Sequence, residues 1–141
     1  MIKFETEYFK ELKFSKKEID KFIESAIKDL NIASDSNVPE VQFQFSYNSL
    51  VKLGISAIAC YDYKVSSRLG HHQKILEKLS EILKNKEIFL YGDKMRKIRN
   101  KEMYDGGIII TSKQAKEYLN FVQESHHLVK DFLKNHFNSL V

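Results

Sequence analysis

The residues best suited to chemistry in this sequence are gathered in one short segment, RKIRNKEMYD, which runs from Arg96 to Asp105. Arg99 can hold a phosphate through two parallel hydrogen bonds and can neutralise charge that develops on it. Asn100 can orient a phosphate oxygen or a ribose 2′-hydroxyl. Tyr104 can donate a proton or stack on a base, but with a pKa of about 10 it is a poor proton acceptor near neutral pH. The segment therefore suits binding of a phosphate ester better than cleavage of one.

Positive charge is concentrated around the same segment. Between Asp93 and Glu102, five basic residues stand against two acidic ones, a net charge of +3 out of +4 for the whole chain. A local excess of this kind is typical of a surface that binds an anionic ligand such as a nucleic acid. The alternative is a solvated helix end, because the helix dipole favours cations near the C-terminus. The predicted nucleic-acid contacts are Lys94, Arg96, Lys97 and Lys101.

Helix geometry limits how these side chains can combine. Residues five apart lie about 140° from each other on a straight helix, so Arg99 and Tyr104 do not share a face. Asn100 and Tyr104 do share one. A second group on a common face consists of Arg96, Arg99, Asn100 and Met103. A composite site with Tyr104 therefore needs a second subunit or a loosened helix end, which Gly106 and Gly107 permit.

Other chemistry-bearing residues are expected to have structural roles. Cys60 is the only cysteine, forms no internal disulfide, and is interpreted as a small core side chain. The neighbours His71 and His72 point about 100° apart, as do His126 and His127, so neither pair offers two metal ligands from one face. His126 also falls on an apolar stripe, where a core histidine is expected. We predict no metal site and no cofactor.

The elements that must position the segment are predicted to be helices. Ser15 and Glu18 have the spacing of a capping box, and Phe14 with Ile19 matches a hydrophobic staple. Apolar residues then recur at helical spacing as far as Leu30. The residues before Phe14 mix apolar and charged types and are interpreted as a helical lead-in.

The middle of the chain is also interpreted as helical. Residues 41–45 alternate like a strand, but a lone strand would have no partner, so we interpret 41–64 as one long helix with Pro39 near its first turn. Gly54 inside this helix predicts a close contact with another helix. The remaining segments are a short helix within 71–86, a loop leading into a helix that ends at Gly106–Gly107, and a long last helix capped by Thr111 or Ser112.

The amino-acid composition limits the fold classes that this chain can adopt. A chain of 141 residues with 43% hydrophobic residues, five Gly and one Pro suits a single helical domain. The sequence predicts an all-α chain, an antiparallel four- to five-helix bundle over residues 1–141. The first residues lack the apolar stretch of a signal peptide, and no apolar run approaches the roughly 18 residues that a membrane span needs. We therefore expect a cytoplasmic protein with no membrane partner.

Arg99 and Asn100, near the end of the next-to-last helix of such a bundle, resemble the motif of the HEPN domains (higher eukaryotes and prokaryotes nucleotide-binding). In that motif an Arg, often followed by a polar residue, precedes a His by four to six residues. Tyr104 stands where that His would be, so the resemblance is to a branch with Tyr in place of the motif His. The middle of the chain, with an aromatic-rich helix, a loop and a helix that begins with His71, is similar to the family as well. The resemblance extends from about Ser15 to Phe132.

The resemblance implies a class of function. Many HEPN proteins are toxins of toxin–antitoxin or phage-defence systems that cleave RNA without a metal, as dimers whose Arg and His residues meet in a cleft between two subunits. Others are non-enzymatic partners of small nucleotidyltransferases. We expect a homodimer that binds RNA or a nucleotide through a basic helix face, with weak or absent ribonuclease activity and an antitoxin or nucleotidyltransferase partner. The alternative is a non-enzymatic helical dimer that acts as the partner subunit of a small nucleotidyltransferase.

Overall fold

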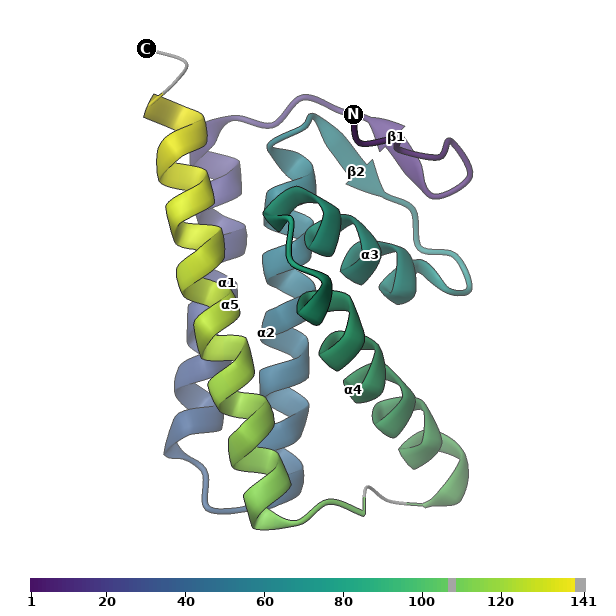
Figure 1. Cartoon of the computed structure of the whole chain (residues 1–141), viewed down its shortest axis with the longest axis vertical. Coiled ribbons are helices and arrows are strands. Elements are labelled where there is room, and N and C mark those ends of the chain that lie inside the picture. Colours follow the sequence, from purple (N-terminus) through teal and green to yellow (C-terminus); the bar gives the residue numbers. More distant parts are fainter. Residues whose placement is uncertain (107–108, 139–141) are drawn as a thin grey trace.

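A computed structural model describes residues 1–106 and 109–138, without the side chains of residues 102–105. Three long helices, α1, α2 and α5, run along the longest axis, with α1 and α2 antiparallel (Figure 1). Helix α3 crosses beside α2, and α4 runs obliquely away from the other helices towards its C-terminal end (Figure 1). The elements are β1 (Phe9–Glu11), α1 (Lys16–Asp35), α2 (Pro39–Ala59), β2 (Tyr63–Val65), α3 (His71–Leu83), α4 (Lys86–Asp105) and α5 (Ser112–Asn138). The predicted all-α bundle is confirmed.

The first helix begins as its sequence predicts. The Ser15 side chain accepts a hydrogen bond from the backbone N–H of Glu18 at 3.1 Å, and the Glu18 carboxylate accepts one from the Ser15 N–H at 3.0 Å. Phe14, just before the cap, packs edge-on against Phe22 with ring centroids 5.8 Å apart. These contacts satisfy two otherwise unpaired backbone donors and fix the direction in which the chain enters α1.

Helix α2 is the centre of the core. Its alternating start at 41–45 is helical, and the helix is buried nearly all round, which is why it shows no single apolar stripe. Gly54 lies against α3, where a methyl group added to it would collide with the Cγ2 of Ile75. The close helix contact predicted at Gly54 is therefore confirmed. The largest fully buried residues of α2 are Phe43, Tyr47, Leu50, Leu53 and Ile58.

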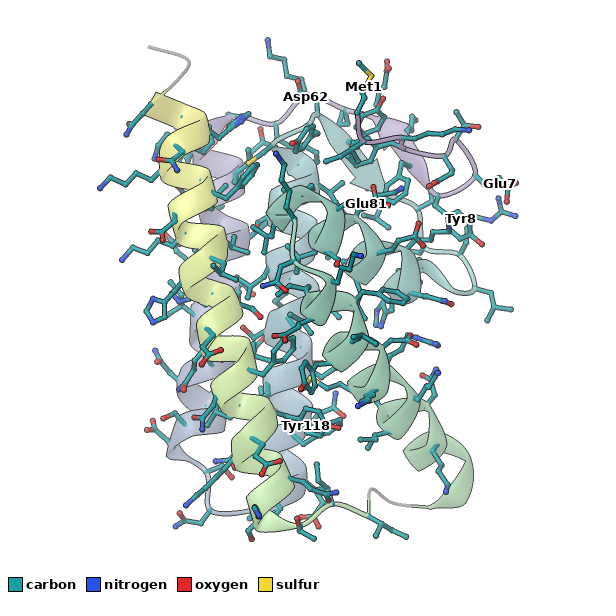
Figure 2. The ribbon with its side chains drawn as sticks, in the orientation of Figure 1. Met1, Glu7, Tyr8, Asp62, Glu81 and Tyr118 are labelled. Atoms are coloured by element: carbon teal, nitrogen blue, oxygen red, sulfur yellow. The ribbon has the colours of Figure 1, made fainter. Side chains whose placement is uncertain are left out.

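A small two-stranded sheet was not predicted. Strand β1 pairs antiparallel with β2, with Phe9 opposite Val65, so both the helical lead-in and the helix extending to Lys64 are wrong. Helix α2 ends because Asp62, labelled in Figure 2, adopts a left-handed backbone with φ 62°. Phe4 then stacks on Tyr63 with centroids 4.3 Å apart. The aromatic contact and the strand pairing together outweigh the weak helical preference of these short segments.

Helix α4 follows α3 without the loop that the sequence suggested. The chain turns at Lys84, which has φ 53°, and the Asn85 side chain accepts a hydrogen bond from the Glu87 N–H at 3.0 Å. Asn85 therefore caps a helix that begins at Lys86, earlier than expected. At the other end Gly106 has φ 82°, the left-handed conformation predicted for the residue that ends this helix.

The last helix packs along α1 and α2. Thr111 and Gln114 exchange reciprocal hydrogen bonds of 3.1 and 3.0 Å, which confirms the cap expected at Thr111 or Ser112. Tyr118, labelled in Figure 2, packs edge-on against Phe43 of α2 at 5.6 Å between ring centroids. The apolar residues that α5 buries are Ala115, Leu119, Val122, Val129 and Leu133. Within the described residues, none of the helices has the length and apolarity required to cross a membrane.

Candidate functional site

Arg96, Arg99 and Asn100 lie together in a cleft between α4 and the start of α3. The cleft encloses about 370 Å³ and is completed by the loop that leads into α3. Its lining residues are Arg68, Leu69, Gly70, His71, His72, Arg96, Arg99 and Asn100. The structure thus brings three residues that share a helix face next to two histidines from another helix.

Arg99 is held over an aromatic ring at the inner side of the cleft. Its guanidinium carbon lies 5.5 Å from the ring centroid of Tyr47, which is a cation–π distance. Its Nε is buried and has no hydrogen-bond partner within the described part of the chain. A buried guanidinium N–H without an acceptor costs free energy. An anion that entered the cleft and accepted this hydrogen bond would remove that cost.

Tyr47 also determines which ring nitrogen of His72 carries the proton. The Tyr47 hydroxyl and the Nδ1 of His72 are 3.0 Å apart. Burial raises the pKa of Tyr47 to about 12, against a smaller opposing effect of Arg99 and Arg96, so the phenol stays neutral. Burial, with repulsion from His71, Arg99 and Arg96, lowers the pKa of His72 to about 4. At neutral pH His72 therefore accepts the Tyr47 O–H at Nδ1 and carries its own proton on Nε2.

His71 has the opposite tautomer. Its Nδ1 lies 2.7 Å from the carbonyl oxygen of Arg68, and a carbonyl oxygen only accepts, so Nδ1 carries the proton. In the neutral ring Nε2 is then the acceptor. The two rings lie close, with centroids 4.4 Å apart and planes at 64°. The pair therefore offers one nitrogen that accepts a hydrogen bond and one that donates a hydrogen bond.

Asp93 positions Arg96 and offsets part of its charge. Its carboxylate accepts a hydrogen bond from the Arg96 Nε at 2.7 Å, and its other oxygen lies 3.4 Å from the Nζ of Lys97. The Asp93 and Arg96 side chains are only 14% and 18% exposed, whereas that of Lys97 is 69% exposed. Arg96 is therefore a fixed donor at the cleft, and Arg99 carries the less compensated charge.

Arg68 closes the cleft from the side of the N-terminal segment. Its guanidinium donates to the carbonyl oxygen of Glu7 at 3.2 Å and lies 6.0 Å from the ring centroid of Tyr8. Figure 2 shows Glu7 and Tyr8 together at one edge of the molecule. The N-terminal segment thus supports the loop from which Arg68 and His71 reach the cleft.

The four basic residues of α4 that were predicted to contact nucleic acid do not form one continuous surface. Lys97 and Lys101 are exposed, and Lys94 lies 5.3 Å from the Tyr91 ring in a separate groove of about 550 Å³ between α4 and α5. That groove also carries three carboxylates, Glu87, Glu117 and Glu124. Carboxylates repel phosphate, so the cleft with the arginines is the better phosphate site of the two.

Two sequence predictions concern other side chains. The backbone of Tyr104 is part of α4, but the side chains of Tyr104 and Met103 lie outside the described part of the structure. The catalytic role of Tyr104 therefore stays a prediction. Cys60 is buried, as expected, and burial followed by repulsion from Asp62 raises the pKa of its thiol to about 12. Cys60 is therefore an inert core side chain.

The remaining histidine pair lies on α5, outside the cleft. His126 is half-buried and His127 is exposed. Burial, then repulsion from His127 and Lys130, lowers the pKa of His126, and its Nε2 has no hydrogen-bond partner among the described residues. His126 is thus a neutral, half-buried residue rather than the hydrogen-bonded core histidine that the stripe suggested. No group of three or more His, Cys, Asp or Glu in the described part of the chain could hold a metal ion.

Comparisons of the chain with protein-family models, with curated proteins and with solved structures returned no match. The HEPN resemblance therefore rests on the residues of this sequence alone. Sequence reasoning missed the contributions of Tyr47, His71 and His72, and considered the two histidines only as metal ligands. Arg68, three residues before His71 in a short loop, is the signal that could have linked this helix start to an anion site.

Proposed function

We propose that this chain is an HEPN-like protein that binds the phosphate backbone of RNA in the cleft between α3 and α4. In this proposal it belongs to a toxin–antitoxin or defence-type module of a bacterium or archaeon. The observation that carries the proposal is the buried Nε of Arg99, which lacks an acceptor within the described part of the chain. A phosphate oxygen is the acceptor that a guanidinium binds best.

The composition of the cleft supports a phosphodiester as ligand. Among the described residues that line it, arginine, histidine and asparagine side chains offer donors and none is a carboxylate. Gly70, the N-cap of α3, makes no side-chain cap, so the positive end of the helix dipole also faces this region. Asn100 is exposed at the edge of the cleft, where its amide can bond a ribose 2′-hydroxyl and favour RNA over DNA.

We further propose that the protein acts as a homodimer through α4. Two of its apolar side chains, Leu90 and Tyr91, are 58% and 41% exposed and could be covered by a second copy. Ribonuclease activity is expected to be weak or absent, since Tyr104 replaces the His of the family motif. A dimer that bound a nucleotidyltransferase and no RNA would be the alternative function, a non-enzymatic partner subunit.

The test is RNA binding as a function of salt. A labelled single-stranded RNA is titrated with the wild type and with a variant that combines Arg96→Gln and Arg99→Gln, and binding is read by fluorescence anisotropy. The variant should bind at least about tenfold more weakly, and the slope of log K against log salt should decrease by about 1.4, or 0.7 for each lost phosphate contact. The matched control removes two exposed lysines of α5 through Lys130→Ala and Lys134→Ala. Equal losses in both variants, or no binding by the wild type, would refute the proposal.

A further inference from the structure

We propose that His71 and His72 are the acid–base pair of a metal-independent RNA cleavage in the cleft, with His71 as the base and His72 as the acid. The pair would do the work that the HEPN motif assigns to its single His. This inference rests on the proposed function, because it requires an RNA phosphate bound at Arg99. It adds two catalytic residues from α3, a helix that the motif does not include.

The geometry gives the two rings different tasks. The Arg68 carbonyl oxygen, 2.7 Å from the Nδ1 of His71, leaves the Nε2 of that ring as a proton acceptor. The Tyr47 hydroxyl, 3.0 Å from the Nδ1 of His72, leaves the Nε2 of that ring as a donor. Both rings line the same cleft as Arg99. The two histidines therefore turn a free Nε2 lone pair and an Nε2–H towards the same cleft, and paired acid–base catalysis needs one acceptor and one donor.

The reaction is an internal transesterification that needs no co-reactant. His71 Nε2 takes the proton of the ribose 2′-hydroxyl while the 2′ oxygen forms a bond to phosphorus. The bond between phosphorus and the 5′ oxygen of the next nucleotide breaks, and that oxygen takes a proton from the Nε2–H of protonated His72. Arg99 stabilises the charge on the phosphoryl oxygens. The products are a 2′,3′-cyclic phosphate and a 5′-hydroxyl, and solvent restores both histidines.

The environment of His72 makes this reaction slow at neutral pH. Burial and the charges of His71, Arg99 and Arg96 lower its pKa to about 4, while Tyr47 bonds its Nδ1. The acid form is then only about one part in a thousand at pH 7, a gap of roughly three pH units. Bound phosphate raises that fraction, because an anion favours the imidazolium. The rate should therefore rise as the pH falls below 7.

The experiment measures cleavage of a labelled single-stranded RNA in EDTA, scored for 2′,3′-cyclic phosphate ends, between pH 5 and 8. The variants are His71→Gln and His72→Gln, and the matched control is His127→Gln, which changes an exposed histidine outside the cleft. Wild type should cleave slowly, and each cleft variant should lose about 10²-fold in rate. The control should keep the wild-type rate. Anisotropy on the same RNA and circular dichroism check that each variant binds and folds.

Three outcomes separate this inference from the proposed function. If the wild type binds RNA but does not cleave it, the acid–base pair is refuted and the binding proposal stands. If the wild type neither binds nor cleaves, the proposed function itself fails. If the wild type cleaves and both cleft variants cleave equally fast, His71 and His72 are not the catalytic pair. As a further readout, Tyr47→Phe frees the Nδ1 of His72 and should shift the pH profile, whereas a purely structural role would leave its shape unchanged.

Discussion

The protonation of His72 predicts how the stability of this protein depends on pH. The pKa of this ring falls from 6.5 to about 4 on folding. Between these values the unfolded chain binds the proton and the folded chain does not, so the stability is fully present above pH 6.5 and is lost as the pH falls towards 4. Lowering the pH is therefore the perturbation, and His72→Gln is the variant that removes the titrating group.

The magnitude follows from the same two values. A gap of about 2.5 pH units corresponds to roughly 3 kcal/mol at most, at about 1.4 kcal/mol for each unit. Because the ring is only half-buried and solvent screens it in part, we expect about 1–2 kcal/mol. The free energy of unfolding of the wild type should fall by this amount more than that of His72→Gln between pH 7 and pH 4.5.

The assay is urea unfolding followed by circular dichroism at the two pH values. His126 and Glu5 also have lowered pKa values in the folded chain and act in the same direction. The difference between wild type and variant isolates His72 from them. An equal loss of stability in both proteins would show that His72 is not held neutral, and the tautomer assigned to His72 would then be wrong.

Three further predictions concern packing, the motif and assembly. Gly54→Ala should lower the free energy of unfolding by about 1–3 kcal/mol, because the new methyl meets the Cγ2 of Ile75. Ile75→Leu, which removes that atom, should reduce this cost, as urea unfolding of the double variant would measure. Tyr104→His should raise cleavage in EDTA by about 10²-fold, and Arg99→Ala in the same background should abolish the gain. An unchanged rate in Tyr104→His would show that position 104 has no catalytic role. Light scattering should give twice the chain mass, and a monomer at every concentration would exclude the homodimer.

Signals confined to a few neighbouring residues made much of the fold predictable. Ser15 with Glu18 and Thr111 with Gln114 form caps within four residues of chain, and each of these helices begins where its cap lies. The sheet was unpredictable for the opposite reason. Its strands have three residues each, too few to show alternation, and β1 meets a partner far along the chain.

The candidate site could likewise be predicted from the sequence only in part. Helix geometry alone places Arg96, Arg99 and Asn100 on one face, and the three residues do line one cleft. The role of His72 depends on Tyr47 and on the packing of α3 against α2 and α4, contacts that no local pattern encodes. Sequence reasoning therefore found the residues on α4 and missed those that another helix brings to them.

The most direct test of phosphate binding in the cleft is the NMR signal of the Arg99 Nε–H group. This group is buried without a partner in the described part of the chain, so its signal reports directly on an acceptor that enters the cleft. Arg99→Lys assigns the signal, and a short single-stranded RNA is then added. We predict a downfield shift that saturates at the RNA concentration at which anisotropy saturates. RNA binding that leaves the Arg99 signal in place would contradict the account.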